Sequence, residues 1–158
     1  MKKGILGILA TVTGAVAGAA AMNYYKSKKV TEKAEKVDKF KGYYNLLNQW
    51  LVIKHEGKSL DNYFLMQGYK SIAIYGMGEL GNRLYEELRN TEVTVKYAID
   101  KKAESTYSEL NVVSLEDELE TVDAVVVTAT FAFDEICEEL ENVLDCPIVS
   151  LETVVYDL

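Results

Sequence analysis

The sequence predicts an α/β protein: a three-layer parallel sheet with strand order 3-2-1-4-5, preceded by a helical neck and an N-terminal membrane helix. Three observations support this fold class. Short apolar runs alternate with helical patterns after residue 70, a glycine-rich turn follows the first run, and a long uncharged stretch lies near the N-terminus. We expect an anchor over residues 1–25, a neck over 26–68 and one folded domain over 69–158.

The N-terminal segment carries no charge from Gly4 to Tyr25, a length that can span a bilayer as a helix. Gly14 and Gly18 have the G-x-x-x-G spacing that allows close helix packing in membranes. More lysines follow the segment than precede it, which predicts a single-pass protein of the cell membrane with its C-terminal domain in the cytoplasm. The alternatives are a cleaved signal peptide, with Ala19–Ala21 at the cleavage site, and a peripheral or packed helix.

The neck is predicted to be helical over residues 30–55, and it carries two apolar stripes. The first stripe has spacings of 3, 4, 3 and 4 and consists of Val37, Phe40, Tyr44, Leu47 and Leu51. The second consists of Tyr43, Leu46, Trp50 and Ile53. One interpretation is that this wide face packs on the domain itself. The other is a homodimer or a partner protein bound through residues 37–53.

Five apolar runs after the neck are predicted to be strands: Ser71–Tyr75, Val93–Ile99, Asn111–Val113, Val122–Thr128 and Pro147–Leu151. Helical patterns follow the first run, through Leu80 to Leu88, and the fourth, over Phe133–Val143. Alternating strands and helices with right-handed connections predict a mainly parallel sheet in the order 3-2-1-4-5.

Composition excludes several classes of function. Residues 1–41 carry nine lysines and three acidic residues, whereas residues 42–158 carry eight basic and 22 acidic residues. The net charge of −8 argues against nucleic acid as the main partner. The single histidine excludes metal sites that need two, and we expect no metal site. Cys137 and Cys146 are expected to be small core residues.

A glycine-rich motif follows the first predicted strand: Gly76-Met77-Gly78-Glu79-Leu80-Gly81. Its G-x-G-x-x-G spacing, between a strand and a helix, is typical of dinucleotide-binding loops. We expect Gly76 to allow the tight turn, Gly78 to let backbone approach a diphosphate, and Gly81 to let the helix pack closely on the strand. The phosphates would lie on the N–H groups of the helix N-terminus. The alternative is that the glycines serve only the turn.

Four further residues complete the candidate cofactor site. Asp100 ends the second predicted strand, where a carboxylate accepts hydrogen bonds from ribose hydroxyls. It should repel a 2′-phosphate and so favour NAD over NADP, a preference that the neighbouring Lys101 and Lys102 weaken. Thr128 and Thr130 follow the fourth predicted strand, beside the expected ligand crevice.

The stretch from Tyr69 to Lys102, with S-I-A-I-Y-G-M-G-E-L-G and Y-A-I-D-K-K, resembles small Rossmann-like domains associated with bacterial cell-surface polysaccharide biosynthesis. The later D-A-V-V-V-T and I-V-S-L-E segments fit the same pattern. The resemblance covers about residues 40–158. It implies nucleotide or nucleotide-sugar contacts at Gly76, Gly78, Gly81 and Asp100, with Thr128 and Thr130 nearby, and it assigns no reaction.

These features favour a membrane-anchored accessory protein that binds a nucleotide or nucleotide sugar in cell-envelope polysaccharide biosynthesis. One alternative is an NAD-dependent oxidoreductase or epimerase-type enzyme acting on a nucleotide sugar. Another is a ligand-free scaffold or nucleotide sensor acting through the neck. No catalytic residue can be identified. The Tyr-x-x-x-Lys spacing of short-chain dehydrogenases occurs at Tyr24/Lys28 and Tyr25/Lys29, beside the predicted membrane segment, and at Tyr97/Lys101, across the end of a strand, and we interpret all three as chance matches.

Overall fold

The computed structural model describes residues 2–106 and 108–158, without the side chains of residues 2–21, 23, 25, 27 and 105. The chain divides into two compact units, Met1–Tyr43 and Tyr44–Leu158. The helix α1 (Lys2–His55) makes up the described part of the first unit, and its last turns belong to the second. The predicted neck helix is therefore confirmed as part of a longer helix.

The membrane anchor predicted over residues 1–25 falls mostly on residues whose side chains lie outside the description. Among the residues that are described, no helix combines the length and the apolar character that a membrane crossing requires. The anchor, its orientation and its two alternatives therefore stay predictions.

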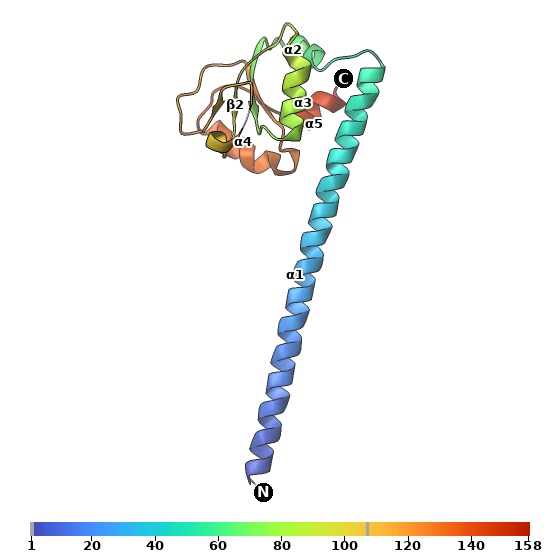
Figure 1. Cartoon of the computed structure of the whole chain (residues 1–158), viewed down its shortest axis with the longest axis vertical. Helices are drawn as coiled ribbons and strands as arrows, with labels where there is room; N and C mark the ends of the chain where they lie inside the picture. Colours follow the sequence, from blue (N-terminus) through green and yellow to red (C-terminus); the bar gives the residue numbers. More distant parts are fainter. Residues whose placement is uncertain (1, 107) are drawn as a thin grey trace. The chain divides into compact units, whose positions relative to one another are not determined.

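The second unit is built on a parallel sheet of five strands within its described residues (Figure 1). The strands are β1 (Ser71–Tyr75), β2 (Thr94–Ile99), β3 (Val112–Val113), β4 (Ala124–Val127) and β5 (Ile148–Ser150). Their order is β3-β2-β1-β4-β5, and every neighbouring pair is parallel, which confirms the predicted topology. The other elements are α2 (Asp61–Gln67), α3 (Glu79–Leu88), η1 (Ala103–Ser105), η2 (Thr130–Ala132), α4 (Phe133–Glu141) and α5 (Leu151–Tyr156).

The fourth strand shows why the apolar runs become strands and where they stop. All four residues of β4 are buried, as expected for a strand covered on both faces. The strand is shorter than the predicted Val122–Thr128, although the N–H groups of Asp123 and Thr128 still donate to the carbonyl oxygens of Ser71 (2.8 Å) and Tyr75 (3.0 Å). The carboxylate of Asp123 accepts hydrogen bonds from the N–H groups of Lys70 (2.9 Å) and Ser71 (2.7 Å).

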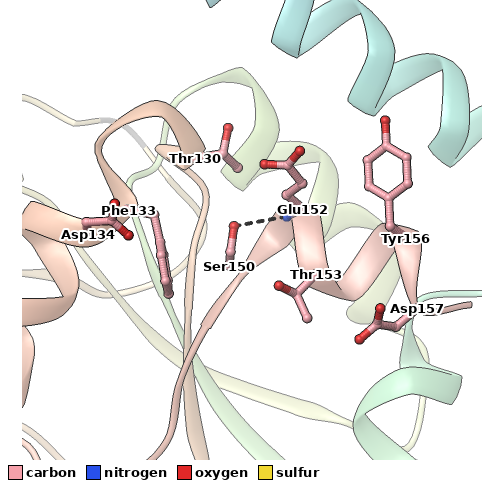
Figure 2. Close-up of a pocket in the computed structure, with 8 residues that line it drawn as sticks. All are labelled: Thr130, Phe133, Asp134, Ser150, Glu152, Thr153, Tyr156 and Asp157. Carbon is pink, nitrogen blue, oxygen red and sulfur yellow. Dashed lines mark hydrogen bonds between the residues drawn. The ribbon is translucent and has the colours of Figure 1, made fainter.

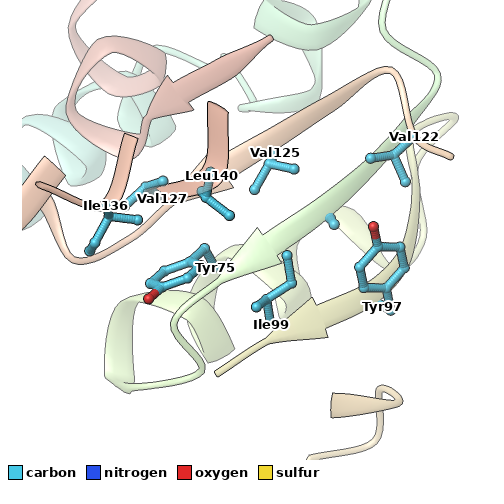
Figure 3. Close-up of a cluster of buried hydrophobic side chains, with 9 residues drawn as sticks. Tyr75, Tyr97, Ile99, Val122, Val125, Val127, Ile136 and Leu140 are labelled. Carbon is cyan, nitrogen blue, oxygen red and sulfur yellow. The ribbon is translucent and has the colours of Figure 1, made fainter. Parts of the chain in front are cut away.

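One face of the sheet is covered by α4 (Figure 3). The residues Tyr75, Ile99 and Val127 of three neighbouring strands share a buried cluster with Ile136 and Leu140 of α4. Successive strand residues point to opposite faces, so Ile72 and Ile74 face the other layer, where α3 packs on β1 and β2. The expected three-layer arrangement follows, with β1 at the centre of the sheet (Figure 1).

The carboxylate of Glu87 in α3 joins three helices of the second unit. It accepts a hydrogen bond from the Trp50 indole of α1 (2.7 Å), and its other oxygen accepts one from the Leu60 N–H before α2 (2.9 Å). The ammonium of Lys54 lies 3.0 Å away. The Ser59 hydroxyl also binds Glu87, at 3.2 Å, and does not cap α2.

The two apolar stripes of α1 have different environments within the second unit. Three residues of the second stripe are 1–6% exposed: Leu46, Trp50 and Ile53. Three residues of the first stripe are 46–69% exposed: Tyr44, Leu47 and Leu51. The interpretation that the whole apolar face packs on the domain is therefore wrong for these residues of the first stripe.

Cys137 and Cys146 are half-buried free thiols, not fully buried core residues. Burial is the largest cause that raises the pKa of each thiol.

Candidate functional site

The glycine loop, residues 76–81, lies at the carboxyl edge of the sheet. Tyr75 at the end of β1 is in register with Ile99 of β2 and with Val127 of β4, and Val127 is in register with Ser150 of β5. The residues that follow these strands therefore share one edge. This register places Asp100 and Thr128 beside the loop, as the sequence predicts.

Two of the three glycines are required by the shape of the loop. Gly76 has φ of +92°, a conformation that favours glycine, and a Cβ there would lie 2.9 Å from the Thr128 hydroxyl oxygen. A Cβ on Gly81 would collide with the carbonyl oxygen of Gly76. The predicted roles of Gly76 in the turn and Gly81 in close helix packing therefore have a direct structural basis.

Gly78 differs from the other two glycines. It is exposed, has an ordinary φ of −77°, and a Cβ there would meet nothing within 4 Å. It is the N-cap of α3, so the first N–H groups of that helix have no acceptor within the helix. The Asn82 amide holds this turn by donating to the carbonyl oxygens of Met77 (3.2 Å) and Gly78 (3.0 Å).

The Asp100 carboxylate binds the loop itself. One oxygen accepts a hydrogen bond from the Met77 N–H (3.0 Å) and the other from the Lys102 N–H (2.9 Å). Each carboxylate oxygen has a second lone pair. Asp100 therefore fixes the loop and can still accept a hydroxyl of a ligand.

Thr128 and Lys101 are both engaged within the protein. The Thr128 hydroxyl is buried and lies 2.7 Å from the Gly76 carbonyl oxygen, so it ties the end of β4 to the loop. The Lys101 ammonium lies 3.0 Å from the Glu139 carboxylate of α4, a hydrogen bond that raises the pKa of the lysine. The Tyr75 hydroxyl nearby is buried and interacts electrostatically with Lys101, and burial raises its pKa.

A cavity of about 500 Å³ opens at the same edge of the sheet, after β4 and β5 (Figure 2). Phe133 and Tyr156 contribute aromatic rings, and Thr130, Ser150 and Thr153 contribute hydroxyls. Three carboxylates also line it, from Asp134, Glu152 and Asp157. Among the predicted site residues, Thr130 lines this cavity.

The carboxylates and hydroxyls of this cavity accept hydrogen bonds, and its aromatic rings offer apolar surface. Such a lining is unfavourable for a phosphate and suits a neutral molecule with several hydroxyls. Within the described residues, no group of three or more His, Cys, Asp or Glu side chains is arranged to hold a metal ion.

Sequence reasoning did not identify Asn82 or the cavity residues after β5. Asn82 lies four residues after Gly78, where its amide returns to the start of α3, and the spacing alone gives no sign of this. Ser150 has a recognisable local pattern, because a serine before a short helix is a favoured N-cap, and its hydroxyl accepts the Glu152 N–H (Figure 2). Because parallel strands end at the same edge of a sheet, the residues that follow β5 could have been predicted to lie beside the candidate site.

The fold and the loop define an α/β protein with a parallel sheet and a glycine turn at its carboxyl edge. The family model described as C2185-like, N-terminal, matches residues 68–147. The chain belongs to this family. No curated protein and no solved structure matches the chain.

Proposed function

We propose that residues 69–158 form a Rossmann-like domain that binds a nucleotide sugar, with the diphosphate on the glycine loop. The observation that carries this proposal is the environment of Gly78. The fold needs glycine at positions 76 and 81, but a side chain at position 78 would meet nothing in the protein. Glycine there leaves the N-terminus of α3 open to a ligand, and that is where a diphosphate is most favourably bound.

The charges around the loop limit how a diphosphate is held. The loop has no basic side chain, and the carboxylates of Glu79 and Asp100 lie at or beside it. Lys101 is paired with Glu139. Binding would therefore depend on the backbone N–H groups and the dipole of α3, with Asp100 accepting a ribose hydroxyl.

The cavity after β4 and β5 supports a sugar as the second half of the ligand. Its hydroxyls, carboxylates and aromatic rings suit a neutral sugar, and its three carboxylates oppose an additional phosphate such as that of NADP. Thr130 would contact the sugar from η2.

We place this binding domain in cell-envelope polysaccharide biosynthesis, as an accessory protein anchored in the membrane by residues 1–25. The resemblance of residues 69–102 supports the process, and the uncharged N-terminal segment supports the anchor. The proposal requires no catalytic group.

The test is a thermal-shift titration of the full-length protein with UDP-, CDP- and GDP-sugars, NAD and NADP. A ligand at 100 times its dissociation constant should add about 2.7 kcal/mol to the free energy of unfolding. Gly78→Thr should abolish the shift while keeping the helix cap, because threonine and glycine are comparable N-caps.

Gly42→Thr is the matched control, because Gly42 also has nothing within 4 Å of its Cβ position. It should leave the shift unchanged. A shift with NAD alone would favour the enzyme or the sensor instead. No shift with any of these ligands, in a folded protein, would mean that the glycines serve only the turn.

A further inference from the structure

The cavity after β4 and β5 has a charge imbalance that a neutral sugar does not compensate. Three carboxylates line it, from Asp134, Glu152 and Asp157, and no Lys or Arg is among its lining residues. Within the described part of the chain, none of these three carboxylates forms an ion pair. A neutral sugar would satisfy the hydroxyls and the rings of the cavity, but it would leave this negative charge without a counter-charge.

The helices account for two of the three carboxylates. Asp134 and Glu152 stand in the first turns of α4 and α5, where the helix dipole favours negative charge. Asp157 is the C-cap of α5, where the same dipole disfavours a carboxylate. A cation in the cavity would therefore stabilise Asp157 at a position that its own helix makes unfavourable.

A buried hydroxyl is a second, independent sign of a ligand. Ser150 at the end of β5 is 7% exposed and lines the cavity. Its oxygen accepts the Glu152 N–H at 3.2 Å (Figure 2), and no described residue accepts a hydrogen bond from its proton. Because a serine hydroxyl both accepts and donates, this proton is available to an acceptor on a ligand, such as a sugar hydroxyl.

The arrangement of the cavity selects an organic cation. Among the described residues, no three His, Cys, Asp or Glu side chains converge as a metal site requires. The volume of about 500 Å³ is that of a small-molecule site. Phe133 and Tyr156 line it with aromatic rings, which attract an ammonium group and offer apolar surface to a sugar ring. Together these groups match a sugar that carries an ammonium group.

We propose that this cavity binds an amino sugar through its primary ammonium group, with the carboxylates of the lining as counter-charges. The inference deepens the proposed function and rests on it for the other half of the ligand, the diphosphate at the N-terminus of α3. Attraction selects the amino sugar over a neutral sugar, and repulsion excludes a sugar acid.

The probes are glucosamine, glucose and N-acetylglucosamine as free sugars, because acetylation removes the charge and keeps the sugar ring. Binding to the full-length protein in nanodiscs of uncharged lipid is measured by saturation-transfer NMR at about pH 6, where the amine is protonated. Glucosamine should bind at least about fivefold more tightly than either neutral sugar, and added salt should reduce the difference.

A double variant locates the charge. Asp157→Asn with Glu152→Gln should weaken glucosamine binding at least about fivefold, to the level of glucose, and should leave glucose binding unchanged. Glu138→Gln is the matched control, because Glu138 is an exposed carboxylate of α4 that does not line the cavity. It should change neither affinity. Circular dichroism checks that each variant remains folded.

UDP-glucosamine and UDP-glucose identify the source of the amine. If UDP-glucosamine binds more tightly than glucosamine and Gly78→Thr removes that gain, the amine and the diphosphate belong to one ligand. Glucosamine binding without such a gain would identify a free amino sugar as the occupant, and the nucleotide titration then tests the glycine loop separately.

Three outcomes would overturn the inference. Equal binding of the three free sugars would remove the charge selection. A preference for glucosamine that survives the double variant would place the amine elsewhere on the protein. Absence of measurable binding for glucosamine, both free and as UDP-glucosamine, would leave the cavity without this ligand even if other nucleotide sugars bind.

Discussion

Gly76, Gly78 and Gly81 belong to one motif, but the structure restricts the residue type at each position differently. Gly76 needs its left-handed backbone, and Gly81 needs the absence of a Cβ beside a carbonyl oxygen. Gly78 is constrained by neither. At the scale of the residue, a glycine motif thus separates into positions that the fold requires and one position that points to a ligand.

Asp123 gives a pH-dependent prediction at the same scale. Hydrogen bonds from the Ser71 N–H, the Lys70 N–H and the Ser71 hydroxyl lower the pKa of this carboxyl below its ordinary value of 3.8. Its contribution to the free energy of unfolding is therefore complete above that value and is lost as pH falls through the lowered pKa.

Asp123→Asn should reduce the free energy of unfolding at pH 7, and the difference from the parent protein should shrink as pH falls below about 4. Urea unfolding at several pH values measures this difference. Asp145→Asn changes an exposed acidic residue outside such a network and is the control. A difference that stays constant with pH would show that the Asp123 charge does not stabilise the fold.

At the scale of the element, α3 joins the site to the neck. Its N-terminus carries the glycine loop, and Glu87 in its last turns binds the Trp50 indole and the Leu60 N–H. The end of α1 and the start of α2 are therefore fixed to the same helix that presents the candidate phosphate site.

Glu87→Ala should lower the free energy of unfolding by about 2–3 kcal/mol, because it leaves the indole and backbone donors without their charged acceptor. Glu86→Ala is the matched control one residue away: Glu86 is exposed and pairs with Arg83, so its loss should cost less than about 1 kcal/mol. Chemical denaturation measures both variants, and equal losses would contradict the role of Glu87.

At the scale of the whole molecule, acidic and basic residues are unevenly distributed along the chain. Residues 42–158 carry 22 acidic and eight basic residues, and the cavity after β4 and β5 adds three carboxylates to one edge. Like charges of this density repel one another in the folded state.

Raising the salt concentration from about 10 mM to about 300 mM should therefore raise the thermal midpoint of the full-length protein, because repulsion between its carboxylates is screened. Differential scanning calorimetry in sodium chloride measures the midpoint. A midpoint that falls with salt would show that attractive ion pairs, such as Lys54–Glu87, outweigh the repulsion.

The strands and the glycine turn could be predicted because they depend on local patterns, and the strand order could be predicted because alternating strands and helices with right-handed connections favour few topologies. Apolar runs such as Val125–Val127 identify strands that are buried on both faces, and the G-x-G-x-x-G spacing after Tyr75 identifies the turn at the edge of the sheet. The ends of strands were less certain, because side chains such as Asp123 bind backbone across 52 positions of sequence.

By itself, the sequence determined the fold class, the edge of the sheet where Gly76, Asp100 and Thr128 meet, and the two stripes of α1. Only the tertiary structure decided which stripe is buried, which loop glycine is free of structural demand, and that a carboxylate-lined cavity lies beyond β5. The spacing of apolar residues in the sequence shows which of them share one face of a helix or strand. Whether that face is covered depends on residues distant in sequence, whose approach no local pattern specifies.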